Sequence, residues 1–288
     1  LITYYNKDLF DKFGAQYPKA GYTWDDLYEM SKKLSRNEGG TAYSGYTPNF
    51  QYMLDMNPYS IPSVDVKTTK PTINTDPRWQ QFFRTLVIPP SQSDVGIKER
   101  KPAASQPWKD LIGGTQALFV YSSSPLAAAT SYWPGHRIDV TTAPVFKDNS
   151  KLQGSMPFGQ YVGITKMAKN KDAAMEVIKY LLSDEVQTVQ ARSGNIPVVT
   201  TRAVWDELGK ETADWSRSLN WEALRKATMA PIPVTGVFER SVNTVYAKYA
   251  SQVMFGELDM NTAFRLAEEE AQKAIDSLKE GYVQGIAY

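Results

Sequence analysis

Residues 154–199 constrain the fold of this chain most, because they predict several elements in a fixed order. The aromatic and β-branched side chains of 158–164 predict a short buried strand. Asn170 is a favourable N-cap for a helix, and Ser183 starts a second helical segment that Gly194 ends before an extended exit. Six apolar residues recur at helical spacing after Asn170, namely Ala173, Ala174, Val177, Ile178, Leu181 and Leu182. One face of this helix is therefore apolar.

Short strands and helices alternate in the rest of the chain, which indicates an α/β fold. The predicted strands are 1–5, 117–121 and 139–144. The predicted helices follow the N-caps Asn6 and Thr23, run from Asp76 to a stop at Pro89 and Pro90, and cover 108–112, 240–255 and 261–279. Residues 45–70 are rich in Tyr, Pro and Asn and predict a long surface connection, a kind of segment that often carries binding residues.

The composition excludes several classes of function. The chain has 32 basic and 31 acidic residues, so it lacks the positive field that a nucleic acid or an anionic bilayer would require. It has no cysteine, which excludes disulfides, thiolate catalysis and cysteine-ligated zinc. No apolar run approaches the roughly 18 to 20 residues of a spanning helix, and Leu1 does not begin a signal peptide. A globular protein without a nucleic-acid partner is predicted.

The residue pattern offers little support for catalysis or metal binding. His136 is the only histidine, and no serine lies in a nucleophile-elbow context. Phosphate-binding glycine loops and calcium-binding loops are absent from the sequence. Two groups of carboxylates have structural explanations: Asp25, Asp26 and Glu29 complement a helix dipole, and 268–270 lie on a solvated helix face. We expect no catalytic residue, no cofactor and no metal ligand.

Four clusters of aromatic and polar side chains remain as candidates for a ligand site. Aromatic residues make up 12% of the chain, more than a core of this size demands. A sugar site needs flat apolar faces together with fixed donors and acceptors for hydroxyl groups. The candidates are Tyr46, Asn49 and Phe50; Tyr121, Ser122 and Ser124; Phe158, Gln160 and Tyr161; and Phe238, Glu239 and Arg240. We expect at least two of these clusters to line one site.

Two motifs in this order resemble a known family. Ala-Lys-Asn-Lys-Asp-Ala-Ala at 168–174 and Gly-Asn-Ile-Pro-Val at 194–198 look like the extracellular solute-binding proteins of ABC importers, in their sugar-binding branch, family 1. The opening Thr-Tyr-Tyr-Asn-Lys-Asp-Leu-Phe is similar to the start of that family's C-terminal lobe. The resemblance covers nearly the whole chain and is specific to the class, but not to the ligand.

The resemblance implies a two-lobe, periplasmic-binding-protein-like fold. Residues 1–144 would form the first segment of the C-terminal lobe, 145–199 a return segment of the N-terminal lobe, and 200–288 the second segment of the C-terminal lobe. The N-terminal part of the first lobe would then be lacking, and the apolar helix face in 145–199 would be exposed unless something covers it. Gln160 stands where many relatives carry tryptophan, and 122–124 replace a more aromatic turn. Fewer flat side chains are then available for stacking, so a polar solute other than a sugar stays an alternative ligand.

The resemblance also implies a function. The chain would be a non-enzymatic, monomeric solute-binding component of an ABC importer, either lipid-anchored or secreted, at the extracellular face of the cytoplasmic membrane or in the periplasm. It would bind an oligosaccharide or sugar by hinge closure and present it to the membrane permease. Phe158, Tyr161, Phe238 and Phe50 would stack on the sugar, and Asn49, Gln160, Glu239 and Arg240 would hydrogen-bond to it. The alternatives are a binder of a peptide, polyamine or chelated ion, a carbohydrate-active enzyme, and a purely structural or interaction domain.

Overall fold

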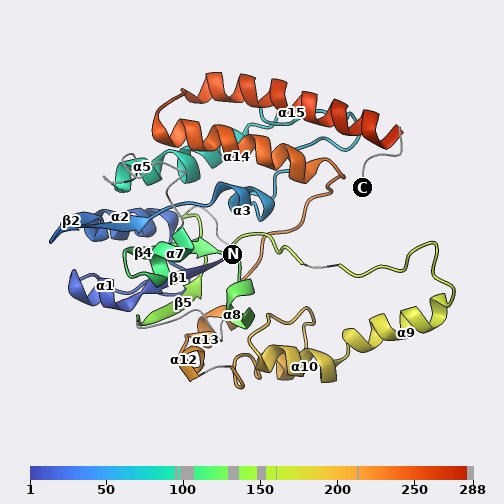
Figure 1. Cartoon of the computed structure of the whole chain (residues 1–288), viewed down its shortest axis with the longest axis horizontal. Helices are drawn as coiled ribbons and strands as arrows, with labels where there is room; N and C mark the ends of the chain where they lie inside the picture. Colours follow the sequence, from blue (N-terminus) through green and yellow to red (C-terminus); the bar gives the residue numbers. More distant parts are fainter. Residues whose placement is uncertain are drawn as a thin grey trace.

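A five-stranded mixed sheet organises the protein (Figure 1). The computed structural model describes residues 1–94, 97, 107–128, 136–147, 154–159, 161–212 and 214–283. The strands are β1 (Ile2–Asn6), β2 (Arg36–Glu38), β3 (Thr41–Tyr46), β4 (Gln116–Tyr121) and β5 (Ile138–Thr142), in the spatial order β2-β3-β4-β1-β5. β3 runs parallel to β4, and β1 runs antiparallel to both β4 and β5.

The strand register places one end of each of four strands along the same edge of the sheet. Ile2 of β1 lies opposite both Tyr121 and Thr142, which end β4 and β5. Tyr46, at the end of β3, pairs with Leu118 of β4. We call this side of the sheet the carboxyl edge, because β3, β4 and β5 all end there while β1 begins there.

Helices cover both faces of the sheet. Their bounds are α1 (Lys7–Lys12), α2 (Trp24–Leu34), α3 (Phe50–Asp55), α4 (Arg78–Phe82), the π-helix η1 (Phe83–Val87), α5 (Pro89–Ser93), α7 (Pro107–Ile112), α8 (Ser124–Ala128), α9 (Lys171–Leu181), α10 (Asp184–Arg192), α11 (Arg202–Trp205), α12 (Asp214–Arg217), α13 (Trp221–Arg225), α14 (Glu239–Phe255) and α15 (Met260–Val283). The larger core lies between the sheet and the layer of α2, α3, α4, η1, α14 and α15. The smaller core lies on the opposite face, where α7 and α13 pack. Alternate residues of β1 enter opposite cores, with Tyr5 in the larger and Tyr4 in the smaller.

The helix starts expected from capping residues are confirmed. Asn6 Oδ1 accepts hydrogen bonds from the backbone N–H groups of Asp8 and Leu9. Thr23 forms a reciprocal capping box with Asp26. Asn170 and Ser183 cap α9 and α10 through their side-chain oxygens.

Of two expectations about the N-terminal half, one is wrong and one is confirmed. The segment 45–70 is not a long surface connection, because β3 extends to Tyr46, α3 follows, and Tyr46 and Phe50 are buried in the larger core. The Tyr46 ring packs 6.4 Å from Trp24 and 6.3 Å from Tyr28, centroid to centroid. The helical run that starts at Arg78 ends at Val87, just before Pro89 and Pro90 as expected, and these prolines then begin the separate helix α5, where the first turn has no acceptor for a backbone N–H.

The segment 154–199 leaves the sheet and carries α9 well away from it (Figure 1). The strand expected at 158–164 is not formed, since its described residues pair with no other strand, and a strand needs a partner for its backbone groups. No residue of α9 is buried, and Val177, Leu181 and Leu182 are exposed. The exposed apolar helix face expected from the sequence is therefore present within the described part of the chain.

Candidate functional site

The carboxyl edge is the natural place for a ligand in this fold. In open α/β sheets, ligands bind outside the carboxyl ends of the strands, because the connections that follow those ends diverge there. Here α3 follows β3, and residues 122–124 follow β4. Residues 143–147 follow β5.

Two passages of the chain run side by side at this edge. The backbone N–H of Gly154 donates to the carbonyl of Thr228 at 3.0 Å, and the N–H of Ala230 donates to the carbonyl of Ser155 at 3.3 Å. The nitrogen of Leu1 donates to Ser155 Oγ at 2.6 Å. The chain therefore leaves for α9 and comes back toward α14 beside the start of β1.

An aromatic group lies where β4 reaches the edge. The ring of Tyr121, the last residue of β4, is 4.3 Å from the ring of Tyr52 on α3 and 6.4 Å from that of Trp108 on α7, measured between centroids. All three side chains are half-buried, so part of each ring faces the surface. Burial, with Tyr52 close by, raises the pKa of Tyr121 well above the ordinary tyrosine value, so its hydroxyl stays a neutral donor at physiological pH.

Hydroxyl groups follow this aromatic group in the chain. Ser122 Oγ and Ser124 Oγ lie 2.7 Å apart, and the hydroxyl of Tyr4 donates to the Ser122 carbonyl at 2.9 Å. The Tyr4 contact fixes the turn after β4 against the sheet. This turn can offer hydroxyl donors and acceptors next to the Tyr121 ring.

The start of α14 brings a second polar group to the same region. Arg240 Nη1 donates to Asp55 Oδ2 at 3.2 Å, so the first turn of α14 is tied to the last residue of α3. Asn243 Nδ2 and Gln51 Nε2 also donate to the Asp55 carboxylate, at 3.0 and 3.1 Å. The side chain of Asp55 is 7% exposed, whereas that of Arg240 is 71% exposed.

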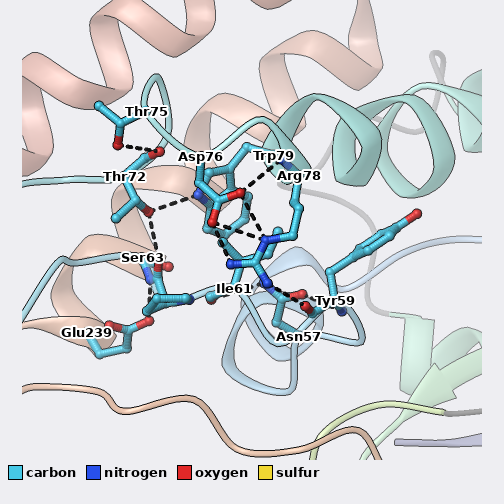
Figure 2. A network of polar contacts seen from close by, with 11 residues as sticks. Asn57, Tyr59, Ile61, Ser63, Thr72, Thr75, Asp76, Arg78, Trp79 and Glu239 are labelled. Atoms are coloured by element: carbon cyan, nitrogen blue, oxygen red, sulfur yellow. Dashed lines mark hydrogen bonds and ion pairs between the residues drawn. The ribbon is translucent and has the colours of Figure 1, made fainter.

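Glu239, the first residue of α14, is held by a hydrogen-bond network that starts at Ser63 (Figure 2). Its Oε1 accepts from the backbone N–H of Ser63 at 2.6 Å. The Ser63 carbonyl in turn accepts from the N–H of Thr72, whose Oγ1 accepts from Trp79 Nε1 at 2.9 Å. Burial raises the pKa of Glu239 above the usual glutamate value, although the hydrogen bond from Ser63 opposes this shift. The network links the start of α14 to the buried Trp79 in the larger core.

Two of the four clusters expected from the sequence contact the same helix, α3. The cluster of Tyr121, Ser122 and Ser124 and the cluster of Phe238, Glu239 and Arg240 both adjoin α3, through Tyr52 and Asp55. Phe238 is half-buried against the larger core, with Lys279 Nζ 5.9 Å from its ring centroid.

The other two clusters are placed differently. Tyr46 and Phe50 are buried, at 0% and 5% exposure, and so present no ring face to a ligand; Asn49 uses its side-chain oxygen to cap α3 at the N–H of Tyr52. Phe158 and Tyr161 lie on the segment leading to α9, exposed by 61% and 84%, and Gln160 lies outside the described residues. The expected roles of Tyr46 as a ligand contact and of Phe50 in stacking are therefore corrected to roles in the core.

Sequence reasoning missed four residues of this region: Gln51, Tyr52, Asp55 and Trp108. A signal for three of them was present, because Asn49 precedes an apolar run in the way of an N-cap and so predicts a helix. On that helix Gln51 and Asp55 are four residues apart and share a face. Reading the segment as a loop concealed this arrangement.

None of the helices described here is long and apolar enough to cross a membrane. Within the described residues, no group of three metal-ligating side chains converges. His136 Nδ1 lies 3.6 Å from Asp8 Oδ2, beside the surface pair of Asp8 and Arg137.

Comparisons with known proteins agree on one type of molecule. The model of the bacterial extracellular solute-binding protein family matches residues 1–188. A sugar transporter protein from Rhizobium etli superposes with a TM-score of 0.69 at 16% identity, over 94% of this chain and 69% of that one. The sugar-binding protein MalE from Xanthomonas citri gives 0.68 at 17%, over 98% and 70%. An ABC substrate-binding protein from Listeria monocytogenes, in complex with cycloalternan, gives 0.65 at 18%, over 96% and 69%. At such identities these superpositions show a shared fold.

Proposed function

The chain belongs to the family of bacterial extracellular solute-binding proteins, and from that membership we propose that it binds a sugar or short oligosaccharide at the carboxyl edge. The observation that carries this proposal is the meeting of half-buried rings with hydroxyl, carboxylate and guanidinium groups around α3. Sugars present C–H-rich faces that stack on rings and hydroxyls that need fixed donors and acceptors. Several similar structures hold a bound sugar or sugar alcohol, among them cycloalternan, D-mannitol and mannobiose.

The proposed roles follow the geometry of the region. Tyr52 and Tyr121 stack on the ligand, and Ser122, Ser124 and Arg240 hydrogen-bond to its hydroxyls. Phe158 and Tyr161 approach the ligand only if the segment that carries them moves toward the edge. Their exposed position on the way to α9 is compatible with such a movement.

We assign the movement to the paired passages at 154–155 and 228–230. Residues 1–144 and 200–288 then form one lobe and 145–199 belongs to another, as the departure of α9 from the sheet suggests. A ligand that contacts both sides binds the closed arrangement better and so increases its population. The closed form would be recognised by an ABC permease.

The proposal includes a cellular setting. A solute receptor of this family acts outside the cytoplasmic membrane, and we propose a lipid-anchored or secreted monomer that releases its ligand to the permease without chemical change. Intact recovery of the ligand after binding would support this role. Ligand turnover abolished by a single carboxylate substitution would instead support a carbohydrate-active enzyme.

A ligand panel tests the proposal directly. Thermal shift and isothermal titration calorimetry should be run with neutral monosaccharides, neutral oligosaccharides, peptides, polyamines and chelated iron. A sugar at one hundred times its Kd should stabilise the protein by about 2.7 kcal/mol, because it binds only the folded state. Stabilisation by a peptide, polyamine or chelate, with none from any sugar, would contradict the proposal.

A further inference from the structure

Asp55 and Arg240 form an ion pair at the rim of the proposed site, and the two side chains differ strongly in exposure. Asp55 ends α3 and is buried, while Arg240 lies in the first turn of α14 and is mostly exposed. A buried carboxylate is stable only when its oxygens are well satisfied. Both oxygens of Asp55 are satisfied, because Gln51 and Asn243 donate to the carboxylate beside Arg240.

Asn243 is itself held in place. Ser63 Oγ donates to Asn243 Oδ1 at 2.5 Å, which leaves the Asn243 amide nitrogen to donate to Asp55. Ser63 also donates through its backbone N–H to Glu239. The carboxylate that receives Arg240 is thus fixed by residues from α3, α14 and the segment between α3 and α4.

Arg240 uses only part of its donor capacity in this pair. A guanidinium has five N–H donors in a planar fork, and Asp55 is the acceptor seen for Arg240 within the described residues. The remaining donors are on an exposed side chain, held at Asp55, which lies three residues after Tyr52 on α3. They can reach a ligand without displacing Asp55.

We infer that Asp55 is a positioning and specificity-determining residue, which holds Arg240 toward the ligand with its charge already compensated and so makes the site select neutral sugars over sugar acids. This inference rests on the proposed function. Neutral hydroxyl oxygens can accept from the remaining N–H groups of Arg240. A uronate carboxylate meets a guanidinium already paired with Asp55, and Glu239 adds a second carboxylate beside it.

Among the described residues, Lys279 is a second cation near this cluster. Its Nζ lies 5.9 Å from the Phe238 ring centroid and donates to Thr69 Oγ1 at 2.5 Å. That contact directs it to the segment before α4 rather than to Asp55. Lys279 therefore does not replace Arg240 as the cation that Asp55 compensates.

The test compares each neutral sugar that binds with its matching uronic acid, by isothermal titration calorimetry at low ionic strength on the full chain. The unsubstituted protein should prefer the neutral sugar. Asp55→Asn should shift the ratio of the two affinities toward the acid by about tenfold, because it leaves the Arg240 charge uncompensated. Adding Arg240→Gln to Asp55→Asn should abolish the shift.

Asp76→Asn is the matched control. Asp76 pairs with Arg78 as an acidic partner of similar type (Figure 2), and neither residue is proposed to contact the ligand or Arg240. Its substitution should leave the affinity ratio unchanged. Arg240→Gln alone should weaken neutral-sugar binding without improving acid binding. Because Arg240 is exposed, this variant can be measured even if Asp55→Asn fails to fold.

The outcomes separate the inference from the function on which it rests. Equal loss of affinity for neutral sugar and acid in Asp55→Asn would make Asp55 merely structural and overturn the inference. A preference of the unsubstituted protein for the acid would overturn it as well, while leaving a sugar-binding function standing. Failure of every neutral and acidic sugar to bind the unsubstituted protein would reject both.

Discussion

Single side chains at the carboxyl edge serve the fold and the proposed site together. Tyr121 stacks on Phe119 within β4, with a centroid distance of 4.8 Å, and contacts Tyr52 across the gap to α3. Glu239 begins α14 and accepts a backbone hydrogen bond from a different segment. Substitutions at such positions must therefore separate lost packing from lost recognition.

Tyr121→Leu should weaken sugar binding by about tenfold while costing little stability. Leucine keeps much of the apolar volume next to Phe119 but lacks a flat ring, whose stacking contributes about 0.5 to 1.5 kcal/mol. Isothermal titration calorimetry measures the loss, and urea unfolding reports the stability. Tyr43→Leu, on β3 beside Phe13 and Lys12, is the control and should bind normally. Equal affinities in both variants would remove Tyr121 from the site.

Glu239→Gln should gain stability relative to the unsubstituted protein as the pH rises. Burial raises the pKa of Glu239 in the folded state, opposed by the Ser63 hydrogen bond, so the folded state binds its proton more tightly than the unfolded chain. The resulting stability is present below the unfolded pKa of about 4.3 and is lost as the pH rises through the folded value. Glutamine keeps the acceptor for Ser63 without the charge.

Melting temperatures between pH 4 and pH 7 measure this effect. The difference between the Glu239→Gln variant and the unsubstituted protein should increase with pH. Glu269→Gln, which removes the partner of Arg265 on the exposed side of α15, serves as the control and should show no such trend. A difference that falls with pH would reverse the assigned sign.

Among the elements, the short helix α3 supplies residues to both the larger core and the proposed site. It has six residues, yet it supplies Phe50 and Met53 to the larger core and Tyr52 and Asp55 to the carboxyl edge. A helix this short is marginal in isolation, so its cap and its packing must hold it. The longer helix α9 differs from α3 in burial: Asn170 caps it, but none of its residues is buried.

Asn49→Ala should therefore lower the free energy of unfolding by about 1 kcal/mol, and Asn170→Ala should lower it far less. Each asparagine caps its helix with the same side-chain oxygen. Of these two caps, only the α3 cap supports buried residues. Only the loss of the α3 cap should therefore lower the free energy of global unfolding substantially. Urea denaturation measures both variants, and Asn49→Ser should restore most of the loss. Equal costs would mean that α9 unfolds together with the core.

At the scale of the whole molecule, one cohesive body carries a long exposed segment. The sheet and its two helical layers contain both cores. The segment from Phe158 to Val189 shows exposed large apolar side chains, including Met167 and Val177. Exposed apolar patches of this kind favour nonspecific association when a monomeric protein is concentrated.

Val177→Lys should reduce concentration-dependent association while changing the free energy of unfolding by less than about 0.5 kcal/mol. The side chain of Val177 is exposed, so lysine there displaces no packed group. Sedimentation velocity measures the association, and urea denaturation the stability. Val242→Lys on α14, which is fully buried, is the contrasting variant and should unfold the protein. Marked destabilisation by Val177→Lys would show that the α9 face is covered.

Local patterns in the sequence determined the starts of the helices, the α/β class and the family. Asn6, Thr23, Asn170 and Ser183 predicted helix starts because a cap bonds to backbone within three residues of itself. The order of motifs predicted a solute-binding protein, which the family match confirms. Burial at 45–70 was missed, since Tyr46 reaches the core through contacts with Trp24 and Tyr28.

Only the tertiary structure decided which side chains meet. Asp55 and Arg240 are 185 residues apart in the chain, and no local pattern encodes their pairing. The apolar run at 158–164 has β propensity, yet a strand forms only where another strand can pair with its backbone. Short-range hydrogen bonds can be read along a sequence, whereas burial, strand pairing and the geometry of a site depend on residues that folding alone brings together.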